Sequence, residues 1–251
     1  MKKKYNGFYL MCSFPERETF IKAAVKGLEH FDFLEIGVPF SDPIADGPVI
    51  AEASHHVLSN GFTFNDLISC LKEIRNLAGN DKDIYLMTYS NIIFNRGADE
   101  LNSLSRDYGI RGLIIPDIPF CEKDFFRKID PPVKIPLVNF ITPESSEESI
   151  KGISGNNSPF IYFISKRGIT GGEFTLDEET RGKIKLAAEL SSSPVVLGFG
   201  ISDSSSAIEA LKNSDGFIMG TVLAEILKNK GLDEYSKFID QLFTDIDHFM
   251  A

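Results

Sequence analysis

The sequence predicts an α/β fold, a single-domain (β/α)8 barrel (TIM barrel) that comprises residues 1–251. Short, continuously apolar runs recur along the chain, as expected for parallel strands buried on both faces, and segments with helix signals lie between them. Most repeats are roughly 22–28 residues long, the length of one strand and one helix with short loops. A chain of 251 residues fits one closed barrel, and no polar linker divides it. An open doubly wound sheet is the alternative.

Eight apolar runs are the expected strands: Phe8–Cys12, Phe33–Gly37, Ile84–Tyr89, Gly112–Pro116, Lys134–Phe140, Phe160–Ser165, Pro194–Gly198 and Gly216–Gly220. Helix signals cover Glu16–Leu28, Val49–Ser59, Phe64–Leu77, Glu178–Leu190, Ser204–Lys212 and Glu234–Phe249. Asp177, either Ser202 or Asp203, and Asp233 stand where N-caps belong. Few residues precede the first strand, so we expect little to plug the bottom of the barrel.

Composition and charge exclude several classes of protein. The net charge of −10 argues against nucleic-acid binding, and no run of about 18 apolar residues could span a membrane. The N-terminus lacks the length and cleavage site of a secretory signal. Three isolated thiols, Cys12, Cys70 and Cys121, are typical of the reducing cytoplasm. The four histidines, His30, His55, His56 and His248, are not spaced as metal ligands, so we expect no metal site and no catalytic histidine.

Glu35 is the first candidate for chemistry because it interrupts an apolar strand. An unpaired carboxylate buried in a barrel wall costs several kcal/mol or keeps its proton, which suits a general acid near neutral pH. The alternative is a glutamate that reaches solvent or a neighbouring lysine.

Asp46 follows in a loop, Pro39–Pro48, that contains a glycine and that three prolines stiffen. In a barrel this loop lies on the C-terminal face of the strands, where active sites are found, so Asp46 and Glu35 would form a carboxyl pair at the mouth. Arg167–Glu173, a glycine-containing segment after the sixth strand, is expected on the same C-terminal face of the barrel. Asp42 and Asp46 are equally suited to form turns or a helix N-cap.

Glycines follow the seventh and eighth strands in Gly198–Ser202 and Gly220-Thr221. Backbone N–H groups at such helix starts bind phosphate, and these two loops are the frequent phosphate site of barrels. The alternative is that the glycines only make tight turns. No P-loop or GxGxxG pattern is present, which favours a sugar phosphate over a nucleotide.

The segment Leu34–Pro48 resembles the signature of the tryptophan synthase alpha subunit family. Further stretches resemble the family in the same order, and together they cover nearly the whole chain from Phe8: Leu86–Asn91, Pro116–Pro119, Ser165–Gly171 and Gly198–Ser202. The resemblance implies a (β/α)8 barrel that splits indole-3-glycerol phosphate into indole and glyceraldehyde 3-phosphate without a cofactor of its own. It also implies a beta-subunit partner that contains pyridoxal phosphate and receives the indole, in an α2β2 tetramer.

The resemblance also implies roles for individual residues. Glu35 matches the catalytic acid and base, and Asp46 the carboxylate at the indole N–H. The residues that match the indole pocket are Tyr89, Tyr162 and Phe199. Thr170 matches the threonine of the closing loop, and the phosphate cradle is matched by Gly171, Gly200, Gly220 and Thr221. The positions that match contacts with the beta subunit are Pro39, Asp42 and Pro119.

Several residues depart from the family pattern: Thr221 replaces the usual serine, Lys166-Arg167 adds two cations beside the closing loop, and Leu10 and Met11 change apolar positions in the first strand. The helix usual before that strand is lacking. These departures leave open a subunit that activates its beta partner but turns over substrate poorly. A different sugar-phosphate isomerase or epimerase barrel is a third interpretation.

Overall fold

A computed structural model describes residues 4–122, 132–164, 176–198 and 200–250. Its strands, in chain order, are β1 (Gly7–Met11), β2 (Phe33–Gly37), β3 (Asp83–Met87), β4 (Ile110–Ile114), β5 (Asn139–Ile141), β6 (Ile161–Ile164), β7 (Val195–Gly198) and β8 (Gly216–Met219). Its helices are α1 (Arg17–His30), α2 (Pro48–Ser59), α3 (Phe64–Ala78), α4 (Ser90–Arg96), α5 (Ala98–Tyr108), α6 (Glu147–Ser154), α7 (Glu178–Leu190), α8 (Ser204–Asn213), α9 (Thr221–Asn229) and α10 (Gly231–Met250).

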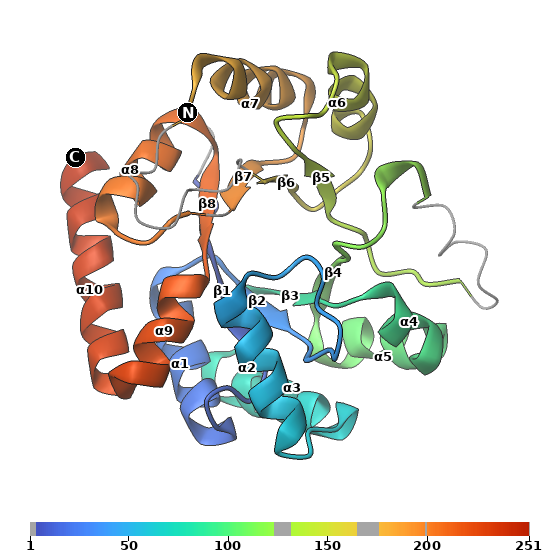
Figure 1. The fold of residues 1–251 in the computed structure, drawn as a ribbon, viewed down its shortest axis with the longest axis vertical. Coiled ribbons are helices and arrows are strands. Elements are labelled where there is room, and N and C mark those ends of the chain that lie inside the picture. The colour runs from blue at the N-terminus through green and yellow to red at the C-terminus, as the bar shows by residue number, and fades with distance from the viewer. Residues whose placement is uncertain (1–3, 123–131, 165–175, 199, 251) are drawn as a thin grey trace.

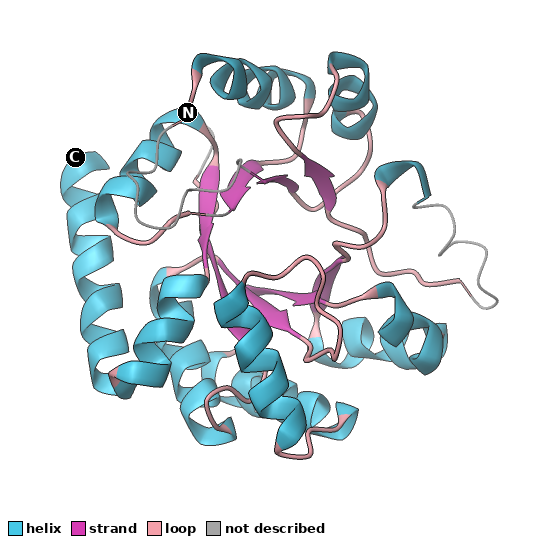
Figure 2. Ribbon diagram, in the orientation of Figure 1, coloured by secondary structure: helices cyan, strands magenta, loops and turns pink. Residues whose placement is uncertain are grey.

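The strands form a ring with the helices around it (Figures 1 and 2). Their order is β4-β3-β2-β1-β8-β7-β6-β5, and all the pairings are parallel. A parallel bridge between Leu113 of β4 and Leu137, just before β5, joins the two ends of this sheet. The predicted barrel is therefore confirmed, and the open doubly wound sheet is excluded. Within the described ranges, every helix is too short or too polar to cross a lipid bilayer.

The strand and helix predictions are confirmed with shifted bounds at several places. β2 and α7 have the predicted bounds, whereas β5 begins five residues later than the predicted start at Lys134. The reason is that Lys134 N donates to Asn102 Oδ1 at 2.7 Å instead of joining a ladder, and Pro136 has no N–H to give.

The predicted helix caps have different outcomes. The side chains of Asp177 and Asp203 accept hydrogen bonds from the backbone N–H groups of Thr180 and Ser206, so both are N-caps. The prediction for Asp233 is wrong, because α10 begins at Gly231 and Asp233 lies inside its first turn. There its negative charge interacts favourably with the positive end of the helix dipole, but Asp233 is not the N-cap of the helix.

Side chains alternate between the barrel interior and the helix layer, as parallel strands require. On β2, Leu34 and Ile36 belong to the apolar layer under the helices, whereas Phe33 belongs to the interior cluster. Glu35 lies on the same face as Phe33 and therefore points into the barrel.

The bottom of the barrel is plugged, contrary to the expectation from the short segment before β1. The Tyr5 ring stacks on Phe33 at 4.7 Å, and Phe33, Tyr85 and Phe160 pack together with centroids 5.1–5.3 Å apart. The Tyr5 hydroxyl donates to Asp83 Oδ2 at 2.6 Å and lies 2.8 Å from the Tyr85 hydroxyl. Tyr5 thus closes the floor of the barrel, because it contacts three aromatic side chains: Phe33 on β2, Tyr85 on β3 and Phe160 just before β6.

Candidate active site

Glu35 is a buried carboxyl group without a hydrogen-bond partner. The residue is 1% exposed, and neither of its carboxyl oxygens has a partner among the residues that the structure describes. Burial, and next the nearby charge of Asp46, raises the pKa of Glu35 to about 8. Glu35 is therefore mostly protonated at neutral pH, and the alternative of a glutamate that reaches solvent or a lysine is excluded.

Asp46 is held over the barrel mouth by a residue of another strand connection. Tyr89 lies two residues after the end of β3. Its hydroxyl donates to Asp46 Oδ2 at 3.0 Å and accepts the Ala45 N–H at 3.1 Å. The Phe40 ring stacks on Tyr89 with centroids 4.8 Å apart. Burial raises the pKa of Asp46 to about 6, and the hydrogen bond from Tyr89 opposes that shift. Asp46 is thus mostly ionised at the pH at which Glu35 keeps its proton.

Ser54 and Asp117, which the sequence analysis did not single out, hold the segments after β2 and β3 in place. Ser54 on α2 is buried, and its hydroxyl both accepts from Phe40 N and donates to Phe40 O, each at 2.8 Å. Asp117 accepts the Ser90 N–H at 3.0 Å and the Ser90 hydroxyl at 2.6 Å. Asp117 thereby caps the start of α4 and holds the chain directly after Tyr89.

Glycines at the mouth leave room that tyrosine rings fill. A Cβ atom on Gly37 would lie 2.0 Å from the Tyr9 Oη, and one on Gly198 would lie 2.2–2.6 Å from Tyr162 ring and hydroxyl atoms. Both tyrosines are buried, at 6% and 8% exposure. Burial raises the pKa of each phenol, so both remain protonated donors. The site therefore has a rim of hydroxyl groups beside the two carboxyls, and Tyr9 is a member that the sequence analysis missed.

The predicted phosphate residues lie at two neighbouring strand ends, because β7 pairs with β8. Gly200 has φ +78, a conformation that favours glycine, and Gly220 precedes the first residue of α9, Thr221. The start of α8 is capped by Asp203, whereas no side chain in the described part of the chain caps α9. The α9 N-terminus is thus the better of the two for an anion. The remaining predicted residues of this group, Thr170 and Gly171, and the predicted pocket residue Phe199 lie outside the described residues.

The three predicted interface residues differ in exposure. Asp42 and Pro119 are exposed, whereas Pro39 is buried. The Ser41 hydroxyl donates to Asp42 Oδ2 at 2.6 Å, and nearby Ile44 is 81% exposed. The loop that carries Pro39, Asp42 and Ile44 connects β2 to α2 at the end of the barrel (Figure 1), whereas Pro119 follows β4.

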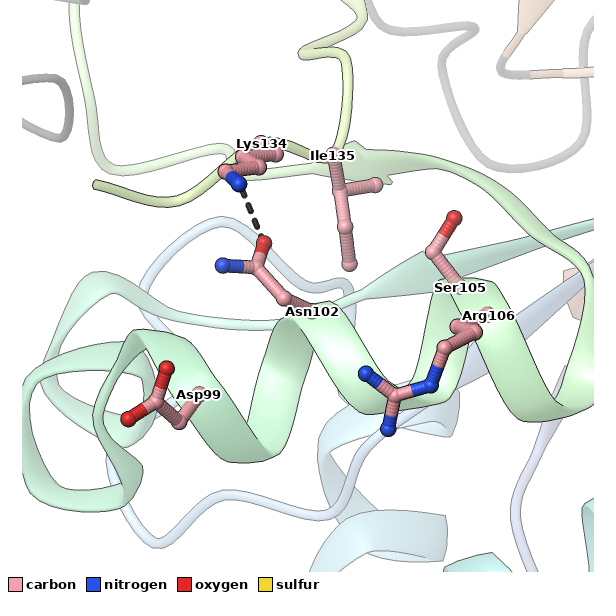
Figure 3. A pocket seen from close by; sticks show the side chains of 6 residues that line it. All are labelled: Asp99, Asn102, Ser105, Arg106, Lys134 and Ile135. Atoms are coloured by element: carbon pink, nitrogen blue, oxygen red, sulfur yellow. Dashed lines mark hydrogen bonds between the residues drawn. The ribbon is translucent and has the colours of Figure 1, made fainter. Parts of the chain in front are cut away.

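A separate hollow of about 550 Å³ lies between α5 and the segment before β5. Figure 3 shows its six lining residues, with Asn102 turned toward Lys134. Neither Glu35 nor Asp46 lines it, so it is distinct from the carboxyl pair. Across the described residues, no group of three His, Cys, Asp or Glu side chains is arranged to hold a metal ion.

Comparisons with known proteins agree with this geometry. The profile of the family "Tryptophan synthase alpha chain" matches residues 2–248. The tryptophan synthase alpha chain of Aquifex aeolicus is 35% identical over 93% of this chain and 90% of its own, and that of Thermotoga petrophila is 36% identical over 91% and 92%.

Solved structures are similar as well. A chain from Aquifex aeolicus has a TM-score of 0.85 at 33% identity, over 97% of this chain and 93% of its own. A tryptophan synthase complex from Pyrococcus furiosus has a TM-score of 0.83 at 25% identity, over 97% of this chain and 100% of its own.

Proposed function

The chain belongs to the tryptophan synthase alpha chain family, and we propose that Glu35 and Asp46 are the catalytic groups of its reaction. That reaction is the retro-aldol cleavage of indole-3-glycerol phosphate to indole and glyceraldehyde 3-phosphate, so the chain is a carbon–carbon lyase of tryptophan biosynthesis. The observation that carries the assignment is the pair itself, a buried carboxyl without a partner among the described residues and a second carboxyl oriented by Tyr89.

The cleavage needs one proton moved from a hydroxyl to a carbon. Glu35, which is protonated at neutral pH, donates its proton to C3 of the indole ring, and the positive charge that forms extends to the ring nitrogen. The ionised Asp46 accepts the hydrogen bond of that N–H and stabilises the charge. The bond from C3 to the side chain then breaks, its electrons return to the ring, and the Glu35 carboxylate takes the proton of the hydroxyl that becomes the aldehyde. Glu35 ends protonated, as it began.

The two pKa values suit these roles because they lie in the required order. Asp46, with a pKa of about 6, is ionised above that pH, and Glu35, with a pKa of about 8, is protonated below that pH. Between these values the protein holds one acid and one base at the same mouth.

The remaining residues of the site bind the substrate in this proposal. Tyr89 and Tyr162 line the indole pocket with Phe199, and Thr170 belongs to a loop that excludes water. The phosphate is held by backbone groups at Gly171, Gly200, Gly220 and Thr221. The uncapped start of α9 supports this assignment, because an anion there gains from the helix dipole.

We also propose that the chain, as a single domain of residues 1–251, passes its indole to a beta subunit within an α2β2 tetramer in the cytoplasm. The resemblance to a chain of a tryptophan synthase complex supports a beta-subunit partner, which contains the pyridoxal phosphate in this family. Asp42 and Pro119, together with the buried Pro39 at the start of the loop, would contact the partner. The stiff loop and the exposed Ile44 suit such a contact, since little ordering entropy is lost on docking.

An indole-release assay tests the function. The isolated chain should release indole from indole-3-glycerol phosphate, its beta subunit should increase the rate, and Glu35→Gln should abolish it. If the chain releases no indole but accelerates the serine chemistry of the beta chain, the regulatory alternative is supported. The intact carboxyl pair does not favour that alternative. Turnover of other phosphosugars without a beta partner would indicate an isomerase.

A further inference from the structure

Tyr9 lies beside Glu35 in the barrel wall. The two residues are directly paired in the β1–β2 ladder, so their side chains enter the interior from adjacent strands. The Tyr9 ring extends toward the mouth across Gly37, and its hydroxyl occupies the space that a Gly37 side chain would fill. Because Gly37 lies two residues beyond Glu35 on the same face, the hydroxyl reaches the mouth side of the Glu35 carboxyl.

Both polar groups lack a good partner. The hydrogen bond that the Tyr9 hydroxyl makes goes to the Met11 thioether at 3.9 Å, which is a weak acceptor. The Glu35 oxygens accept no hydrogen bond from any described residue. Buried polar groups in folded proteins are normally satisfied, so an unpartnered carboxyl on the strand next to a phenol that donates to a thioether indicates a bond that forms in another state of the site.

Four titratable groups act electrostatically on Tyr9: Asp46 after β2, Glu35 on β2, Tyr89 after β3 and Tyr162 on β6. Tyr89 donates to Asp46, whereas Tyr162 also lies near enough to Glu35 to interact with it. Tyr9 differs from Tyr162 in its place, because it is the residue directly paired with Glu35 on the neighbouring strand.

We propose that Tyr9 is a positioning residue that donates a hydrogen bond to the Glu35 carboxylate once Glu35 has given its proton to the substrate. This inference rests on the proposed function, because at neutral pH the ionised Glu35 arises as the intermediate of that proton transfer. A buried carboxylate is costly without a donor, and the phenol supplies one in the interval before Glu35 takes the hydroxyl proton. The bond also directs the second carboxylate oxygen toward the substrate.

The test compares Tyr9→Phe with wild type by ¹³C NMR of glutamate labelled at Cδ, with the Glu35 signal assigned by its loss in Glu35→Gln. Tyr9→Phe keeps the ring over Gly37 and removes one oxygen whose partner is a thioether, so the fold should be retained. We expect the Glu35 pKa to rise by about one unit, a tenfold change in the ionisation constant. The kcat should fall about tenfold while KM changes less than about twofold, since Tyr9 acts through Glu35 and not on the substrate.

Tyr235→Phe is the matched control, because it removes a buried hydroxyl that donates to Ala23 O on the outer side of the barrel. It should leave the Glu35 pKa unchanged. An unchanged Glu35 pKa in Tyr9→Phe, a shift in Asp46 instead, or a rise in KM at constant kcat would each overturn the inference. A wild-type chain that releases no indole would instead overturn the proposed function, and the NMR titration would still report on the Tyr9–Glu35 contact.

Discussion

The Tyr89 hydroxyl joins two strand connections by donating to Asp46 Oδ2 at 3.0 Å and accepting the Ala45 N–H at 3.1 Å. A group that follows β3 thus sets the position of a carboxylate that follows β2. The hydrogen bond favours the charged form of Asp46, so one hydroxyl controls both where this carboxylate lies and at what pH it ionises.

Tyr89→Phe should therefore raise the pKa of Asp46 by about half a unit to one unit, while the ring stays stacked on Phe40. The kcat/KM for indole release should fall several-fold near pH 6 and less near pH 8. Rates measured across this range check the prediction. An equal loss at every pH would mean that Tyr89 acts on the substrate alone.

The wild-type enzyme should show a bell-shaped dependence of kcat/KM on pH. Its acidic limb, near pH 6, reflects protonation of Asp46, and its basic limb, near pH 8, reflects ionisation of Glu35. Initial rates of indole release in buffers of constant ionic strength measure both limbs. Activity that keeps rising through pH 9 would show that Glu35 is not the proton donor.

Glu35→Gln should be stabilised relative to wild type as the pH rises. Burial raises the pKa of Glu35 from its ordinary value of 4.5 to about 8, so its contribution to folding is complete below pH 4.5 and is lost as the pH rises through about 8. Glutamine does not titrate. The unfolding free energy of the variant minus that of wild type should increase by about 3–5 kcal/mol over this range. Urea unfolding at both ends of the range tests this, and a constant difference would contradict it.

Gly37→Ala should disable the site, because its Cβ would lie 2.0 Å from the Tyr9 Oη and 2.5 Å from Cζ. The ring must move into the mouth, which we expect to cost about 1–3 kcal/mol of stability and most of the activity. Gly182→Ala on α7 is the control, since no heavy atom of the described segments lies within 4 Å of the Cβ that it would add. It should keep full activity and gain up to about 1 kcal/mol. Equal behaviour of the two variants in unfolding and indole-release assays would contradict the packing described for Tyr9.

Tyr5→Ala should lower the unfolding free energy by about 3 kcal/mol, because it removes the ring that closes the barrel floor. Tyr5→Phe keeps the ring and loses the hydrogen bond to Asp83, so its cost should be about 1 kcal/mol. Neither should change kcat at a temperature at which both are folded, since the floor and the mouth are at opposite ends of the strands. Chemical unfolding and indole release together check this pair of variants.

Local pattern was sufficient for the barrel and for Glu35. Glu35 can be recognised because it interrupts a continuously apolar run, whereas its inward direction follows only once the structure places Leu34 and Ile36 in the helix layer. The roles of Glu35 and Asp46 in the reaction remain predictions that the assays above address.

Contacts between distant residues were beyond local pattern. Ser54 holds Phe40 across 14 positions, Asp117 holds Ser90 across 27, and Tyr5 meets Asp83 across 78. Each is an ordinary polar or aromatic residue in its own segment, and its partner can be identified only from the folded barrel, which brings the two segments together. The same applies to α4, which is seven residues long and ends at Arg96 before its C-cap Gly97, and which is therefore too short for an apolar stripe to reveal it.

The ring also has a weakest seam. In the described residues, one bridge joins β4 to the segment before β5, with Leu113 N donating to Pro136 O and Val138 N to Leu113 O, each at 2.8 Å, whereas the other junctions pair two to five residues. This seam lies across the ring from the β1–β8 junction. If the seam parted transiently, water would enter the barrel interior while β1 and β2, which pair at five positions, stayed in register, so Tyr9 and Glu35 would keep their alignment.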